Sequence, residues 1–388
     1  MGDGTVSMHG GAAWRVSHQR RIEYDLVKAP DLFDPGNEAL LSIGRVRPGR
    51  RFVVVDEQVA RHHGQRIHAY FAAHAVSARI VVFPGGEASK TADAWLDLVR
   101  ELDAFPIHRR DEPIIAIGGG VLTDVVGFVA GSYRRSVPHI KVPTTLMGYV
   151  DASVGIKTGI NFNNNKNRLG SFEPPCRVLL DHTLLRTLPR RQLLNGVCEI
   201  IKLAVIRDAA LFAQLEAHGG PSVAAAFQDA AGGDILDRAI AGMLEELQPN
   251  LFEEELERKV DFGHTFSQGL EARHGERLLH GEAVLLDIMV SCLVARRRGL
   301  LSDAETRRVF GLIERLGIEP ETALLDVEVI WQSLLDRVEH RNGLQRVPLP
   351  RRLGGCVFVN DITRQEIAEA VTALNQRMAV ENEPILER

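Results

Sequence analysis

The stretch Glu112-Pro-Ile-Ile-Ala-Ile-Gly-Gly-Gly-Val-Leu-Thr-Asp124 decides the fold of the first half of this 388-residue chain. Its apolar run has the length and β-branched content of a buried parallel strand, and it leads directly into three glycines. A run with helical periodicity, Thr123–Ala130, follows. The order strand, tight turn and helix is the unit from which doubly wound parallel sheets are built.

Two more apolar runs, Arg51–Asp56 and Arg79–Pro84, precede this stretch. Segments of helical periodicity, Gln58–His74 and Ser89–Phe105, separate the three runs. The alternation predicts a Rossmann-like α/β domain, on which ligands bind at the carboxyl ends of the strands.

The second half has a different pattern, because strand-like runs nearly vanish after Leu184. A chain of 388 residues is expected to form two domains. We predict a flexible tail over residues 1–18, an α/β domain over 19–182 and an all-α domain over 183–388. Amphipathic patterns predict helices at Arg190–Arg207, Ala209–His218, Gly233–Glu246, His264–His274, Gly281–Arg298, Asp303–Leu316 and Thr363–Gln376.

The composition excludes several classes of protein. A formal net charge of −5 without a long basic run gives no reason to expect nucleic-acid binding. The four cysteines never form a Cys-x-x-Cys pair, which fits a reducing compartment. Since no apolar stretch has the length of a signal core or a membrane span, we expect a soluble protein of the cytoplasm.

Polar residues and glycines follow the predicted strand ends. Glycines between a strand and a helix let the backbone approach a pyrophosphate, whose charge the helix N-terminus favours. Three glycines alone fit a plain turn equally well, Asp124 could instead cap the helix, and Thr144 and Thr145 could be turn hydroxyls. Their agreement at successive strand ends predicts a dinucleotide site made of Asp56, Glu87, Lys90, Gly119, Gly120, Asp124, Thr144 and Thr145.

Two histidines and one glutamate of the second half suit a divalent metal. His264 and His280 are expected on two successive helices, and both have glycine neighbours that leave room for an ion. Glu199 lies one helical turn before Lys202 in a largely apolar segment, so its charge needs a partner. A lone histidine is more often structural, and Glu199 with Lys202 could be a surface pair. Two histidines, one carboxylate and open positions otherwise match a catalytic zinc site.

Basic residues gather between the two predicted sites, at Arg134, Arg135, Lys157 and Lys166, with Asn167 beside the last. Arginine and lysine near turns suit a phosphate ester, although a solvated charged face is the alternative.

These motifs together closely resemble those of the dehydroquinate synthase-like sugar phosphate cyclases. The resemblance spans roughly residues 22–376 and keeps the order of the motifs. It is carried by Gly-Gly-Gly-Val-x-x-Asp-Val-Val-Gly-Phe, Tyr-Arg-Arg, Pro-Thr-Thr-Leu, Val-Asp-Ala-Ser-Val-Gly-Ile-Lys-Thr-Gly, Lys-Asn-Arg-Leu-Gly-Ser-Phe, Glu-Ile-Ile-Lys and Phe-Gly-His-Thr.

The resemblance implies an NAD-binding domain, a helical metal-binding domain and a homodimer. It makes Glu199, His264 and His280 the ligands of Zn²⁺ or Co²⁺. Arg135 matches an arginine that reaches the substrate phosphate, in dehydroquinate synthase from the neighbouring subunit. It places Asp151, Lys157, Asn167 and Lys202 around the sugar phosphate substrate. Asp151 and Lys157 also adjoin the NAD. The eight residues at the strand ends match NAD contacts.

Departures from dehydroquinate synthase concern the substrate. That enzyme has asparagine where this chain has Asp261, a second histidine where it has Gln268, and a carboxylate-binding arginine where it has Glu257. The acidic run Glu253–Glu255 would repel a carboxylate, so 3-dehydroquinate synthase is a poor alternative. The chain instead looks like the 2-epi-5-epi-valiolone synthases, which act on sedoheptulose 7-phosphate.

The resemblance implies transient oxidation by NAD, phosphate elimination, reduction and intramolecular aldol cyclisation, with inorganic phosphate as co-product. His340 or Arg341 could add a phosphate contact. Because the related synthases usually have proline at the position of Gln268, a 2-epi-valiolone product stays open, whereas demethyl-4-deoxygadusol synthase fits less well. A metal-dependent polyol dehydrogenase and a catalytically silent regulator are the rival interpretations from other classes.

Overall fold

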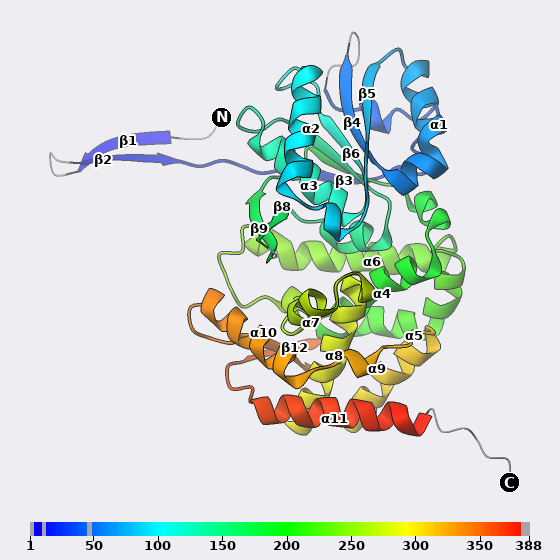
Figure 1. The fold of residues 1–388 in the computed structure, drawn as a ribbon, viewed down its shortest axis with the longest axis vertical. Coiled ribbons are helices and arrows are strands. Elements are labelled where there is room, and N and C mark those ends of the chain that lie inside the picture. The colour runs from blue at the N-terminus through cyan, green and yellow to red at the C-terminus, as the bar shows by residue number, and fades with distance from the viewer. Residues whose placement is uncertain (1–3, 10–12, 45–48, 164, 382–388) are drawn as a thin grey trace.

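The computed structural model describes residues 4–9, 13–44, 49–163 and 165–381. Figure 1 shows a sheet-containing part stacked on a helical part along the long axis of the molecule. The predicted combination of an α/β domain with a helical domain is confirmed. Where one ends and the other begins stays a prediction.

The sheet of the first part has six parallel strands in the order β3-β10-β7-β6-β4-β5. The three predicted strands are confirmed, and the other three were not predicted. In chain order the strands are β3 (Asp25–Lys28), β4 (Arg50–Asp56), β5 (Ser77–Phe83), β6 (Ile114–Gly118), β7 (His139–Pro143) and β10 (Arg177–Leu180).

Helices cover both faces of this sheet, which follows from the two-residue period of a strand. Val53 and Val55 face the apolar cluster that includes α1 (Glu57–Ala73). Phe52 and Val54 face the cluster that includes α2 and α3 on the other side. These two helices span Ala92–Ala104 and Gly120–Ser132. Since both faces are covered, only the strand ends are left to bind a ligand.

The second part is helical, with one added hairpin of strands β11 (Val347–Arg352) and β12 (Gly355–Val359). Helix α10 was not predicted, and α7 begins three residues later than predicted. The helices are α4 (Arg190–Ile206), α5 (Ala209–Ala224), α6 (Ala230–Leu247), α7 (Ser267–His274), α8 (His280–Arg297), α9 (Asp303–Arg315), α10 (Val327–His340) and α11 (Arg364–Glu381).

Two short elements lie between the sheet and the helical part. The π-helical turn η3 (Gly148–Ala152) follows β7, and the antiparallel hairpin of β8 (Lys157–Phe162) and β9 (Asn165–Phe172) comes next. In Figure 1 this hairpin lies where the two parts meet. It carries Lys157 and Asn167, so two predicted substrate residues lie between the domains.

The structure describes two strands within the predicted tail, whose flexibility stays a prediction. Residues Gly4–His9 and Ala13–His18 pair as the antiparallel strands β1 and β2, which project from the body in Figure 1. Residues 1–3 and 10–12 of that segment lie outside the described part. Among the described helices, none is long and apolar enough to cross a membrane.

Candidate active site

The carboxyl ends of β4, β6 and β7 form one edge of the sheet, here called the cofactor edge. Asp56 ends β4 and caps α1, because its Oδ1 accepts from the backbone N–H of Gln58 at 2.9 Å. A Cβ atom on Gly85 would lie 2.8 Å from Oδ2 of Asp56, and one on Gly118 would lie 3.0 Å from its Cβ. Glycines therefore leave space beside this carboxylate.

The N-terminus of α3 lies close to the chain that follows β7. A Cβ on Gly119 would lie 3.1 Å from Thr145, and one on Gly120 would lie 3.0 Å from Ala152. The backbone N–H of Thr144 donates to Gly118 at 3.0 Å, so the ends of β6 and β7 are joined. The glycines thus fit the predicted pyrophosphate turn, in which a side chain would fill the space near the helix N-terminus.

Lys90 joins the cofactor edge to the β8–β9 hairpin. Its buried Nζ donates to Oδ2 of Asp124 at 2.7 Å and to Oδ1 of Asn167 at 2.5 Å. Nearby, Nδ2 of Asn161 donates to Oε1 of Glu87 at 2.8 Å. The structure therefore brings four predicted residues together from three separate segments.

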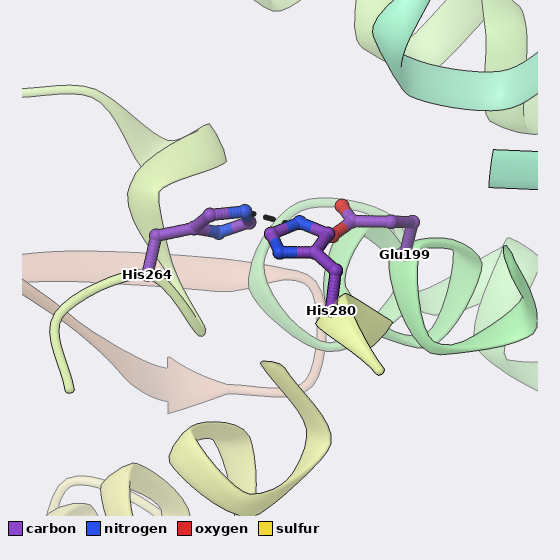
Figure 2. A group of neighbouring side chains, drawn as sticks. All are labelled: Glu199, His264 and His280. Carbon is purple, nitrogen blue, oxygen red and sulfur yellow. Dashed lines mark ion pairs between the residues drawn. The ribbon is translucent and has the colours of Figure 1, made fainter. Parts of the chain in front are cut away.

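Glu199, His264 and His280 converge in the helical part, as Figure 2 shows. Nε2 of His264 and Nε2 of His280 lie 3.6 and 3.5 Å from Oε1 of Glu199. Three ligands at about 2.1 Å from a tetrahedral ion would be about 3.4 Å apart. We call these three residues the metal cluster, because their ligand atoms all lie within 4.8 Å of one another.

The chemistry of the metal cluster fits a divalent cation. Glu199 is fully buried and neither carboxylate oxygen accepts a hydrogen bond, although Lys202 forms an ion pair with it. Burial alone would raise the pKa of Glu199, but Lys202 and His264 lower it, so the carboxylate is ionised. Burial and the charge of Lys202 lower the pKa of His264 to about 4, which leaves a neutral ring able to bind metal.

His264 is not on a helix, which corrects the prediction. It lies in the turn between the 3₁₀ turn η6 (Lys259–Asp261) and α7, where Gly263 has φ +77° and a Cβ would lie 2.8 Å from Val284. The buried carboxylate of Asp287 on α8 accepts from the backbone N–H groups of the N-cap residue of α7 and of the first residue of that helix, at 2.6 and 3.2 Å. Packing against α8 therefore holds the turn.

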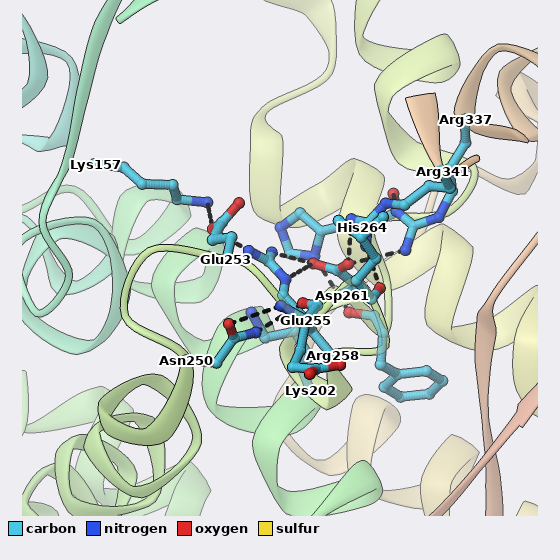
Figure 3. A network of polar contacts seen from close by, with 12 residues as sticks. Lys157, Lys202, Asn250, Glu253, Glu255, Arg258, Asp261, His264, Arg337 and Arg341 are labelled. Carbon is cyan, nitrogen blue, oxygen red and sulfur yellow. Dashed lines mark hydrogen bonds and ion pairs between the residues drawn. The ribbon is translucent and has the colours of Figure 1, made fainter. Parts of the chain in front are cut away.

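Asp261 is surrounded by three arginines, as Figure 3 shows. Arg258 binds its Oδ1, and Arg337 and Arg341 donate to its Oδ2 at 2.9 and 2.5 Å. Burial would raise the pKa of Asp261, but Arg258 and Arg337 lower it far below the usual range. Since both carboxylate oxygens of Asp261 accept hydrogen bonds from arginines, its role is to orient these arginine side chains.

A second carboxylate extends this network towards the hairpin. Glu253 pairs with Lys157 at 3.1 Å and also with Arg258. Four cations and two carboxylates thus form one cluster, which is net positive. The expected repulsion by the acidic run Glu253–Glu255 is correspondingly reduced at Glu253. The sequence analysis missed Arg258 and Arg337, although Arg337 and Arg341 have the four-residue spacing of one helix face.

Asp151 lies in η3, which packs against α4, the helix of Glu199 and Lys202, and two other predicted residues lie apart. Burial would lower the pKa of Lys202, but Glu199 and, after it, Asp151 raise it. Arg135 is exposed in the turn after α3, at the opposite edge of the sheet from the cofactor edge. His340 is exposed at the end of α10.

Comparisons with known proteins agree with this arrangement. Residues 80–195 match the family described as 3-dehydroquinate synthase N-terminal, and residues 196–337 match 3-dehydroquinate synthase C-terminal. A 2-epi-5-epi-valiolone synthase of Streptomyces albus is 48% identical over 92% of this chain and 90% of its own. A 2-epi-valiolone synthase of Stigmatella aurantiaca is 33% identical over 96% and 94%.

A solved structure has the same fold along nearly the whole chain. It is ValA, the 2-epi-5-epi-valiolone synthase of Streptomyces hygroscopicus subsp. jinggangensis, with NAD⁺ and Zn²⁺ bound. The TM-score is 0.90 at 43% identity, and the match covers 94% of this chain and 100% of ValA. From these matches and from the motifs it carries, the chain belongs to the 3-dehydroquinate synthase family of sugar phosphate cyclases.

Proposed function

We propose that this protein converts sedoheptulose 7-phosphate into 2-epi-5-epi-valiolone and inorganic phosphate. The observation that carries the proposal is that α4, which holds Glu199 of the metal cluster, packs against η3, the element that follows the cofactor edge. Chemistry that needs a hydride acceptor and a metal at one carbon requires this adjacency. The identity of 48% to a synthase of that name supports the choice of substrate.

The site residues divide between two ligands. The cofactor edge would hold NAD, and Glu199, His264 and His280 would hold Zn²⁺ or Co²⁺. When bound, NAD accepts and returns a hydride, and the metal binds hydroxyl oxygens and polarises the one that becomes a ketone. The enzyme then acts as a lyase that eliminates phosphate.

The chain's own side chains would bind and orient the sugar phosphate. Lys157, on the exposed start of β8, supplies a cation towards the space between the domains. Arg258 supplies a second cation through the network around Asp261. Lys202, buried beside Glu199, holds an ammonium donor where the substrate hydroxyls would meet the metal cluster. The surplus of positive charge favours a phosphate ester.

The position of Arg135 supports the homodimer that the family resemblance implies. Within its own chain Arg135 lies at the wrong edge of the sheet to reach the metal cluster, so we propose that a second subunit presents it. Arg135→Ala and His264→Ala should each be inactive alone. After unfolding and refolding together, they should recover up to about a quarter of wild-type activity, because mixed dimers contain one intact site. No recovery would contradict a shared site.

The deciding experiment is incubation of the purified protein with sedoheptulose 7-phosphate, catalytic NAD⁺ and Zn²⁺. Phosphate release without net NADH, with an NMR spectrum of 2-epi-5-epi-valiolone, is the expected result. A spectrum of 2-epi-valiolone would move the protein to the sister activity, which Gln268 leaves open. NADH accumulating with polyols and no phosphate would indicate a dehydrogenase, and activity only on 3-deoxy-arabino-heptulosonate 7-phosphate would indicate 3-dehydroquinate synthase.

A further inference from the structure

The two ring nitrogens of His280 have different partners. Nε2 faces Glu199 and the metal cluster, whereas Nδ1 lies 3.0 Å from Oε1 of Glu271. An ionised carboxylate only accepts hydrogen bonds, so Nδ1 carries a proton towards Glu271, and Nε2 is the nitrogen that would bind a metal. Glu271, on α7, is 4% exposed at its side chain, so water does not replace this contact.

The second oxygen of Glu271 accepts a hydrogen bond from the β8–β9 hairpin. Nζ of Lys166, on β9, donates to Oε2 of Glu271 at 2.6 Å. Glu271 therefore makes one bond to a metal-cluster histidine and one to the hairpin between the domains. His264 differs, because its Nδ1 lies 3.2 Å from the backbone carbonyl of Phe262 within its own turn.

The hairpin is anchored on the cofactor side by the next residue. Asn167 has a left-handed backbone with φ +52°, and its side chain accepts from Lys90 beside Asp124. Its backbone N–H also donates to Oδ1 of Asn161 at 2.8 Å. Lys166 and Asn167 are thus adjacent in the chain but bind opposite sides of the site. This anchoring limits how far Lys166 can move from Glu271.

We propose that Lys166 and Glu271 are positioning residues that hold the His280 ring in its metal-binding orientation, so that the cofactor-binding half of the molecule contributes to metal affinity. The proposal deepens the proposed function and rests on its metal site alone, whatever the sugar. Partners that hydrogen-bond a metal-bound histidine fix its tautomer, and their loss typically costs about 10- to 100-fold in metal affinity.

The test is a Co²⁺ titration of metal-free protein, followed by the visible absorption of the bound ion. Glu271→Gln should weaken Co²⁺ binding about 10- to 100-fold and Lys166→Met about 10-fold. The double variant should be no weaker than Glu271→Gln, because Lys166 acts through Glu271. Lys28→Met is the matched control, since Lys28 on β3 pairs with Asp237 on α6 and contacts no residue of the metal cluster.

Each outcome decides the proposal. Unchanged Co²⁺ binding in Glu271→Gln overturns the positioning role, and unchanged binding in Lys166→Met overturns the contribution of the hairpin. Equal weakening in Lys28→Met would assign the effect to the domain interface in general, and so would also overturn it. Lys166 is 38% exposed, so its variant keeps the proposal testable if Glu271→Gln does not fold. Wild-type protein that binds Co²⁺ but releases no phosphate from sedoheptulose 7-phosphate would refute the proposed function and leave this inference standing.

Discussion

The cofactor edge and the metal cluster are built in different ways. The cofactor edge is made of strand ends, glycines and turn residues, and each contributes a small part through the backbone or one hydrogen bond. The metal cluster consists of three side chains from α4, the turn before α7 and the start of α8. Each of the three supplies an atom that no neighbour can replace.

Because of this difference, a single mutation should weaken ligand binding partially at the cofactor edge but abolish it at the metal cluster. At the cofactor edge, losing one contact leaves the others in place. At the metal cluster, losing one of three ligands leaves Glu199 with a buried charge and too few donors for the ion.

His264→Ala should abolish metal binding and activity together. One of three ligands is lost, so we expect phosphate release to fall about a thousandfold or more. Metal analysis and a phosphate assay measure the two quantities. His218→Ala, on the exposed face of α5, is the control and should behave as wild type. Bound zinc at full stoichiometry in His264→Ala would show that His264 is not a required metal ligand.

Gly120→Val should weaken NAD⁺ binding without loss of metal. A Cβ atom at position 120 would lie only 3.0 Å from the Cβ of Ala152. The larger valine side chain should therefore push η3 away from α3. We expect about a hundredfold loss of affinity, or about 2.7 kcal/mol. Isothermal titration with NAD⁺ measures it. Gly64→Val, with open space around its Cβ in α1, should leave binding intact. Loss of zinc in Gly120→Val would show that the cofactor edge and the metal cluster do not bind their ligands independently.

Lys90→Met should have an intermediate effect. Removing the buried ammonium leaves Asp124 and Asn167 without their shared donor, at a cost of about 1–3 kcal/mol. We expect about a tenfold loss of NAD⁺ affinity and a lower Tm. Lys259→Met removes a half-exposed pair with Glu246 and should change stability by less than about 1 kcal/mol. Identical behaviour of the two variants would contradict a role for burial at Lys90.

Lys141→Met should raise stability near neutral pH, by an amount that depends on pH. Burial lowers the pKa of Lys141 on β7 to about 8, with partial compensation by Asp124. Between about pH 8 and 10.5 the unfolded chain binds the proton more tightly, so this residue's contribution to stability rises with pH. The Tm advantage of Lys141→Met at pH 7.5 should shrink by pH 10, by the equivalent of about 2 kcal/mol. A constant difference across that range would refute the shift.

Much of the fold could be predicted because its signals are local. The apolar runs of β4, β5 and β6 are read from consecutive residues, as are the glycines at the start of α3. Helix α10 was not predicted because it begins Val-Glu-Val-Ile-Trp, whose alternation and β-branched content resemble a strand. His264 was predicted on a helix because periodicity does not reveal the turn that Gly263 makes against α8.

The sequence alone determined the fold class, the family and the residue types at both sites, since each depends on motifs of a few consecutive residues. Only the tertiary structure decided which side chains meet. The pairing of Lys166 with Glu271 spans 105 positions, and that of Asp261 with Arg341 spans 80. Spacing along the chain does not encode such contacts, because they depend on how α7, α10 and the β8–β9 hairpin pack. The partners of the metal cluster are therefore a property of packing.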